Sequence, residues 1–288
     1  MLITRHHGRL ASGLGVSWLE AGQGPAAILL HGFPELAISW RAQLTALATH
    51  HRVIAPDLRG YGESDAPVGW RRYRPAALVR DVAELADLVG EPAPHLVGHD
   101  WGGAIAWMAA SALPGRFVSL AVLNCPHPAV MLRALATSPA QLCRSWYMFA
   151  FQLPWLPEWI FRRRAREWIT QAFRGSAANP HPFDDAALEP YVAQARGGLA
   201  GGINYYRAAL RTPPGRWRRI EIPTLLAWGV GDAFLGRSLA RPARYRRLVR
   251  SLRVAWIEDA AHWVQQEAPA TVNALLLDHF ARSVRHDG

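Results

Sequence analysis

The sequence contains no lysine, so all 32 of its basic residues are arginine, against 22 acidic residues. An absence this complete is more typical of codon bias across a genome than of selection for phosphate binding. The net charge of +10 bears on association and not on fold. A nucleic-acid surface would combine a basic stripe with base-stacking aromatics or a known binding module. The arginines instead cluster in separate segments that we interpret as solvated faces, and we expect no nucleic-acid partner. The clusters are 71–74, 161–166, 216–219 and 244–250.

Cysteine and long apolar runs are also scarce. Cys125 and Cys143 are the only cysteines, which suits a reducing compartment and neither a disulfide framework nor a metal cluster. No run of about 18 apolar residues could cross a bilayer, so we expect no membrane partner. The N-terminal stretch MLITRHHGRL lacks the apolar region of a secretory signal. These absences favour a soluble, cytoplasmic protein that holds no metal.

The chain has enough apolar residues to build a well-buried core, because 50% of its 288 residues are hydrophobic and 19% are charged. Short apolar runs alternate with longer amphipathic ones, which is typical of a mostly parallel sheet with crossover helices. Leu78, Val82 and Leu85 recur at helical spacing and predict a helix over 75–88. A hairpin near 9–22 is expected before the parallel strands. Those strands are predicted at 26–32, 51–57, 94–99, 117–124, 223–229 and 252–258.

The alternation breaks between about residues 128 and 216. This segment has no convincing strand, many aromatics, and helical runs at 139–152 and 158–173. We interpret it as a helical cap inserted between the fourth and fifth parallel strands, over the sheet edge where α/β proteins bind ligands. The predicted organisation is therefore a core of residues 1–128 and 217–288, with a cap of residues 129–216.

The stretch LVGHDWGGAIAW has the form of a nucleophile elbow, with Gly98 and Gly102 two residues either side of the centre. A serine is usual at that centre, and this chain has Asp100. Later strand ends are followed by Asp232, in VGDAFL, and His262, in DAAHWVQQEAP. The order nucleophile, acid, histidine is that of the α/β hydrolases, which predicts a catalytic triad.

The stretch HGFPE follows an early strand, where this fold takes one donor of its oxyanion hole. We assign the hole to the backbone N–H groups of Phe33 and Trp101, and we expect both residues to contact substrate as well. The cap aromatics Trp146, Phe149, Phe151 and Trp155 indicate an apolar pocket, with Phe151 a candidate for substrate binding.

Together HGFPE, DLRGYGESDAP, GHDWGG, NCPHP, GDAFL and AHWVQQEAP resemble the epoxide hydrolases of the α/β-hydrolase fold, from about residue 10 to the C-terminus. In the cap, SWYMFAFQLPWLPE and GGINYYRAAL are similar to the family segments that carry ring-opening tyrosines, which implies that role for Tyr147 and Tyr206. One departure is Ala261, where the family has glycine before the histidine.

The resemblance implies that a small apolar epoxide and water are the substrates, with no cofactor, and it leaves a homodimer open. A carboxylate suits this reaction, because alkylation gives an ester that water can cleave, whereas a serine would give an inert ether. His262, oriented by Asp232, would activate that water. Two alternatives stay open: a haloalkane dehalogenase, which shares the aspartate and the following tryptophan, and a non-catalytic ligand-binding member of the fold.

Overall fold

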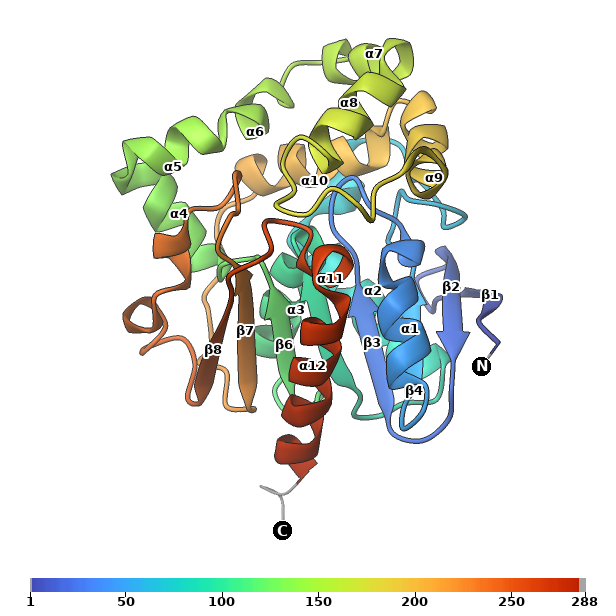
Figure 1. Ribbon diagram of the computed structural model, residues 1–288, viewed down its shortest axis with the longest axis vertical. Helices are drawn as coiled ribbons and strands as arrows, with labels where there is room; N and C mark the ends of the chain where they lie inside the picture. The colour runs from blue at the N-terminus through green and yellow to red at the C-terminus, as the bar shows by residue number, and fades with distance from the viewer. Residues whose placement is uncertain (1, 285–288) are drawn as a thin grey trace.

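An eight-stranded sheet in the order β1-β2-β4-β3-β5-β6-β7-β8 runs through the centre of the molecule (Figure 1). The structure is a computed structural model that describes residues 2–284. β1 and β2 pair antiparallel, as do β2 and β4, and the strands from β4 to β8 pair parallel. The strands are β1 Thr4–Arg9, β2 Gly15–Ala21, β3 Ala26–Leu30, β4 Arg52–Pro56, β5 His95–His99, β6 Leu120–Leu123, β7 Thr224–Gly229 and β8 Leu252–Ile257.

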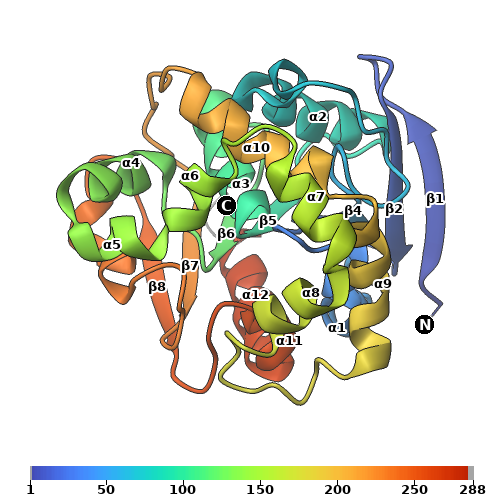
Figure 2. The same ribbon diagram turned by 90° about the horizontal axis from the view of Figure 1, so that it is seen from above.

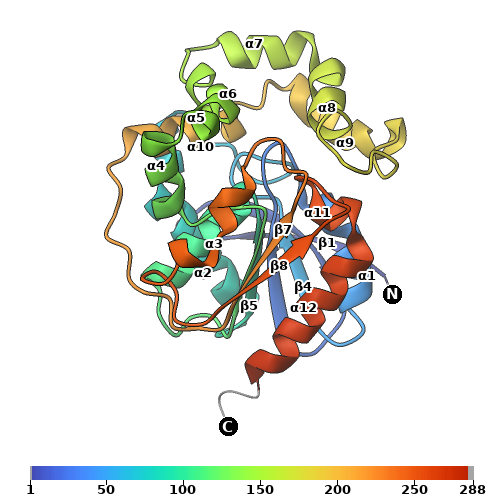
Figure 3. The same ribbon diagram turned by 60° about the vertical axis from the view of Figure 1, so that its left-hand side comes forward.

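Helices cover both faces of the sheet, because its parallel strands are apolar on both sides. Ile28 and Leu96 face the core layer under α2 and α3, whereas their neighbours Leu29 and Val97 face the layer under α1 and α12. The core helices are α1 Arg41–Leu47, α2 Pro75–Leu88, α3 Trp101–Ala112, α11 Val264–Glu267 and α12 Pro269–Val284. Figure 3 shows α12 and α1 on one side of the sheet and α2 and α3 on the other.

The mostly parallel sheet and the helix at 75–88 are confirmed, and all six parallel strands lie within the predicted ranges. The expected hairpin begins earlier than predicted, since its first strand is Thr4–Arg9 and residues 10–14 form the turn. β1 is a polar, largely exposed edge strand. It therefore lacks the alternation of apolar residues by which a strand is recognised.

The regular elements between β6 and β7 are all helices, and we call residues 128–211 the cap. Its helices lie over the carboxyl ends of the parallel strands (Figures 1 and 2) and have their own apolar cluster, which includes Phe161, Phe173 and Ile203. Both long helical runs predicted here are in fact interrupted, the first at Ser145 and the second at Arg164. The cap helices are α4 Pro128–Thr137, α5 Pro139–Arg144, α6 Trp146–Ala150, α7 Leu156–Arg163, α8 Ala165–Phe173, α9 Asp185–Arg196 and α10 Ala200–Arg211.

Over the part of the chain that the structure describes, none of the helices is both long and apolar enough to cross a membrane. In the same residues, no three histidine, cysteine or acidic side chains gather in a group that could hold a metal ion.

Candidate active site

Asp100 sits in a strained turn between β5 and α3. Its φ of 48° and ψ of −119° lie outside the regions that non-glycine residues prefer. The turn requires glycine on both sides: a Cβ on Gly98 would lie 2.3 Å from the Gly102 carbonyl oxygen, and one on Gly102 would lie 2.1 Å from that of Leu30. The Asp100 side chain makes no capping hydrogen bond to α3. The carboxylate is therefore presented to the space above the sheet and is not used as a helix cap.

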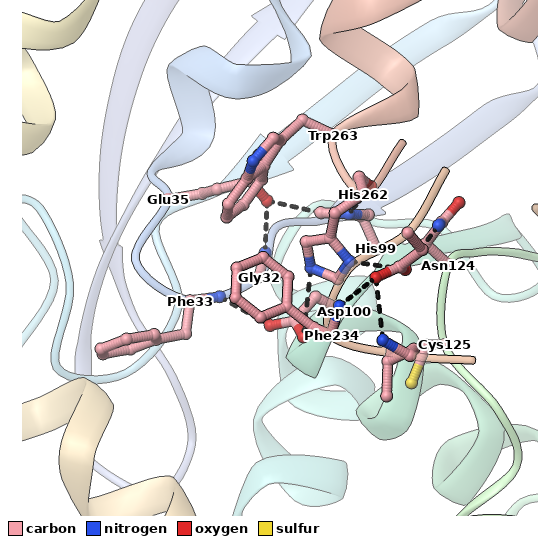
Figure 4. A network of polar contacts seen from close by, with 12 residues as sticks. Gly32, Phe33, Glu35, His99, Asp100, Asn124, Cys125, Phe234, His262 and Trp263 are labelled. Carbon is pink, nitrogen blue, oxygen red and sulfur yellow. Dashed lines mark hydrogen bonds and ion pairs between the residues drawn. The ribbon is translucent and has the colours of Figure 1, made fainter. Parts of the chain in front are cut away.

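The two carboxylate oxygens of Asp100 have different neighbours (Figure 4). The backbone N–H of Phe33, just beyond β3, donates to Oδ1 at 2.8 Å. His262 Nε2 lies 3.7 Å from Oδ2, which is an ion-pair distance but too long for a hydrogen bond. Trp101 begins α3, where backbone N–H groups have no carbonyl partner within the helix. Oδ1 thus accepts from Phe33, one of the two N–H donors expected for the oxyanion hole, and Oδ2 faces the histidine.

Asp232 and His262 follow β7 and β8, and the sheet brings these neighbouring strand ends together. His262 Nδ1 donates to Asp232 Oδ2 at 2.8 Å. Asn124 Nδ2 donates to the same oxygen at 2.7 Å, and the N–H groups of Phe234 and Leu235 donate to Oδ1. These four donors hold the Asp232 carboxylate in place, and the carboxylate in turn fixes the imidazole ring of His262. Nε2 of that ring faces Asp100.

The charges of the triad depend on one another. Burial by itself would lower the pKa of His262, but the Asp232 and Asp100 carboxylates outweigh it and raise that pKa to about 10. Burial would likewise raise the pKa of Asp100, but His262, His99 and the Phe33 N–H hold it below its usual value. At neutral pH the site therefore contains a carboxylate nucleophile facing an imidazolium.

A buried network supports the three loops from behind, and sequence reasoning assigned it no role. His99 Nδ1 lies 2.7 Å from Glu35 Oε2, and His99 Nε2 lies 2.9 Å from the backbone oxygen of His262. Gly32 N–H and the side-chain amides of Gln265 and Gln266 also donate to Glu35. Burial would raise the pKa of Glu35, but His99 and the Gly32 N–H hold it below its usual value. The two ring nitrogens of His99 thus each face an oxygen acceptor, one on Glu35 and one on the His262 backbone.

Glu35 and His99 lie within the motifs HGFPE and GHDWGG, so the sequence did mark their positions. What it could not indicate is that both side chains are fully buried and paired with each other. Asn124, in NCPHP, was missed in the same way. Its φ of 42° is a conformation that asparagine tolerates better than most residues. The residue type is therefore compatible with this strained position, but it did not indicate a role.

Two cavities, of about 650 and 660 Å³, meet at Asp100, Tyr147 and Tyr206, which line both of them. The first is also lined by Trp101, and the second by Phe33 and Phe151. Burial raises the pKa of Tyr147 and of Tyr206 well above the usual value, and the charge of Asp100 adds to the shift. Both phenols therefore keep their protons at neutral pH and act as hydrogen-bond donors.

The other cap aromatics are divided between the cavity and the surface. Trp146 lines the second cavity, although its side chain is largely exposed. Phe149 and Trp155 line neither cavity and are open to solvent. The sequence left open which of these aromatics line the pocket, because residue type alone does not tell which side of a short helix faces inward.

A family model described as "alpha/beta hydrolase fold" matches residues 25–269. That match, the sheet order and the elbow at Asp100 define the class of protein. Among curated proteins, the chain is 37% identical to human epoxide hydrolase 4 over 92% of this chain and 75% of that protein. It is 33% identical to epoxide hydrolase A of Mycobacterium tuberculosis over 93% and 94%.

Solved structures give the same result. An epoxide hydrolase of Bacillus megaterium in complex with an inhibitor superimposes with a TM-score of 0.86 at 25% identity, covering 96% of this chain and 100% of that one. One from an endophytic Streptomyces also gives 0.86, at 27% identity, covering 99% and 96%. The chain belongs to the α/β-hydrolase fold family and, within it, to the epoxide hydrolases.

Proposed function

We propose that this protein hydrolyses epoxides to vicinal diols in two steps, through a covalent ester on Asp100. The observation that carries the proposal is a carboxylate at the elbow, with one oxygen held by a backbone N–H and with two phenols of the cap lining the same space. The names of its curated relatives favour the same substrate class.

In the first step, Asp100 Oδ2 attacks a carbon of the epoxide and the carbon–oxygen bond of the ring breaks. The nucleophile needs no general base, because it is already ionised. The leaving oxygen would be a strongly basic alkoxide, so it must be protonated as it forms. Tyr147 and Tyr206 supply the hydrogen bonds and the proton. The product is an alkyl ester of Asp100 with a free hydroxyl on the neighbouring carbon.

The formation of the ester also prepares the second step. It removes the charge of Asp100, one of the two carboxylates that raise the pKa of His262. The imidazolium then gives up its proton, which replaces the one that the phenols donated. His262 becomes a neutral base only after the nucleophile has reacted.

In the second step, His262 Nε2 takes a proton from water, and the oxygen of that water attacks the carboxyl carbon of the ester. The developing oxyanion is Oδ1, which already accepts the Phe33 N–H. Collapse of this intermediate expels the ester oxygen as an alkoxide, which takes the proton of the newly formed Asp100 carboxylic acid. The diol then leaves, Asp100 is a carboxylate again, and His262, which has kept the proton from water, is the imidazolium. Protons and charges balance over the cycle.

The test is to separate the two steps with His262→Gln. The variant should still be alkylated by an aryl epoxide, because Asp100 needs no base, but it should not hydrolyse the ester. We expect the intact-protein mass to rise by one substrate mass, with the label on the peptide that contains Asp100. Asp100→Asn is the matched control and should show no label. Steady turnover by His262→Gln without an adduct would exclude the covalent assignment.

The dehalogenase alternative is tested with a panel of epoxides and haloalkanes. A halide leaving group needs two N–H donors and no proton transfer. The indole N–H of Trp263, which lines the second cavity, is already bonded to Ala172 O and Ser176 Oγ. We therefore expect diol formation to exceed halide release. Halide release at a matching or higher rate would favour the dehalogenase.

A further inference from the structure

One short stretch of the cap carries several large apolar side chains that are open to solvent. They belong to α6, to α7 and to the loop between them, which Figure 2 shows from above. Trp155 is 72% exposed, Trp146 58% and Trp159 51%. We call this group the cap face, and it consists of Trp146, Phe149, Leu153, Trp155 and Trp159. Soluble monomeric proteins rarely gather so many exposed apolar side chains in one place without using them.

Packing within the cap does not account for these positions. α7 buries Pro157 and Phe161 on its inner side, and Trp159 lies on the other side. Trp155, directly before α7, has a left-handed backbone with φ of 52°, which costs free energy for a residue other than glycine. Neither packing nor the backbone preference of tryptophan therefore accounts for the exposed position of Trp155.

The charge beside the cap face is positive. Arg162, Arg163 and Arg164 follow Trp159 within a few residues and are all exposed. The guanidinium of Arg163 lies 5.9 Å from the centre of the Trp159 ring. The acidic residues between positions 141 and 170 are Glu158, which is buried and paired with Arg207, and Glu167. Tryptophan next to arginine on the outer side of a helix is the composition of segments that bind the surface of an anionic bilayer.

The same segment forms a wall of the second cavity. Leu153, Leu156 and Ile160 line that cavity, as does Trp146. One stretch of chain therefore separates an apolar cavity leading to Asp100 from an apolar, positively charged outer surface. A hydrophobic small molecule concentrates in a bilayer, so this arrangement suits a ligand that arrives from lipid.

From these four observations we propose that the cap face docks on the surface of a bilayer that contains anionic lipids. The tryptophans insert between headgroups and acyl chains, and the arginines bind the phosphates. None of the helices in residues 2–284 is long and apolar enough to cross the membrane, and the proposed association is peripheral and reversible. The proposal goes beyond the proposed hydrolysis, and its test does not require turnover.

The test is co-sedimentation of the full chain with vesicles, either of phosphatidylcholine alone or of phosphatidylcholine mixed with phosphatidylglycerol. We expect binding that requires the anionic lipid, weakens as salt rises, and shifts tryptophan emission to shorter wavelength. The double variant Trp155→Ser with Trp159→Ser should bind roughly 10-fold or more weakly, because each loses the burial of a large aromatic. Neither residue lines either of the two cavities that meet at Asp100, so turnover of a water-soluble epoxide in the absence of vesicles should be unchanged.

Two matched controls distinguish binding through the cap face from non-specific binding to vesicles. Val68→Ser removes an apolar side chain that is 95% exposed outside the cap, and it should bind as the parent does. Arg163→Gln with Arg164→Gln should weaken binding several-fold, whereas Arg246→Gln with Arg247→Gln makes the same change in net charge and should not.

Three results would overturn the proposal. The first is an absence of binding to anionic vesicles, and the second is equal losses in the cap-face and control variants. The third is self-association in sedimentation velocity that is lost in the tryptophan variant, which would make a second copy of this chain the partner.

Discussion

Tyr205 and Tyr206 are adjacent in the sequence and have different environments. The hydroxyl of Tyr205 donates to the Arg59 carbonyl oxygen at 2.9 Å, within the core. Tyr206 lines both cavities, and its ring lies 5.8 Å from that of Tyr147, centre to centre, at nearly a right angle. α10 separates these roles because consecutive residues of a helix point in directions about 100° apart.

This difference gives a matched test of the ring-opening acids. Tyr147→Phe and Tyr206→Phe should each slow alkylation of Asp100 by roughly 10- to 1,000-fold, since each removes one of two proton donors. The double variant should nearly abolish it. Tyr205→Phe should alkylate at the parental rate. The measurement is single-turnover adduct formation in the His262→Gln background, and normal alkylation by the double variant would reduce both tyrosines to packing residues.

At the scale of the element, the end of β6 orients the acid of the triad. Asn124 follows this strand, donates to Asp232 Oδ2 and to Ala261 O, and accepts from the N–H of Gly229. One side chain thereby links the loops after β6, β7 and β8. Ala261, which departs from the family pattern, contributes a backbone carbonyl to this link, so the added methyl group does not remove the contact.

We expect Asn124→Ala to slow hydrolysis of the ester by roughly 10-fold, because it leaves one oxygen of a buried carboxylate short of a donor. Alkylation should be unaffected, so the adduct should accumulate in the steady state. Rapid-quench mass spectrometry measures this accumulation. Asn273→Ala makes the same change on α12, outside both cavities, and should leave both steps unchanged. If Asn124→Ala slowed only alkylation, its assignment to the acid would be wrong.

Sequence patterns predicted the elements whose burial is regular. The helix at 75–88 was found because an apolar stripe faces the sheet, and the parallel strands because both of their faces are buried. The order of Asp100, Asp232 and His262 was readable because their positions follow strand ends. The pairing of Glu35 with His99 was not readable, because a pattern does not show which polar side chains are buried together. The cap face was missed for a related reason, since short helices divide their aromatics between inside and outside.

At the scale of the whole molecule, the charge of His262 couples the site to stability. Its pKa in the folded state is about 10, above the value of about 6.5 in an unfolded chain. A basic group whose pKa is raised by folding stabilises the folded state. This stabilisation is complete at pH values below the pKa of the unfolded chain, and it is lost as pH rises through about 10.

The unfolding free energy of the parent should therefore fall between neutral pH and pH 10, and His262→Gln should show a smaller fall. Urea titrations of both proteins across that range measure the difference. Identical pH dependence in the two proteins would show that His262 is neutral in the resting site.

The docking proposed for the cap face would revise the expectation that the protein has no membrane partner. That expectation rested on the absence of an apolar run long enough to span a bilayer. Among the helices that the structure describes, none is both long and apolar enough to do so. A surface that only rests on lipid needs no such run, because exposed tryptophan and arginine side chains suffice.

The pairing of β6 with β7 has a consequence for how such proteins diversify. Leu123 and Ala227 are partners in neighbouring strands, although the whole cap lies between them in the sequence. The inserted segment thus leaves and re-enters the sheet at adjacent points, so its length and content can change without moving either strand. Asp100 lies before this interval, and Asp232 and His262 lie after it. A graft of the corresponding stretch of a relative would therefore change which molecules reach Asp100 while leaving Asp100, Asp232 and His262 in place. Such a graft has to bring its own pair of ring-opening tyrosines, because Tyr147 and Tyr206 lie within the interval.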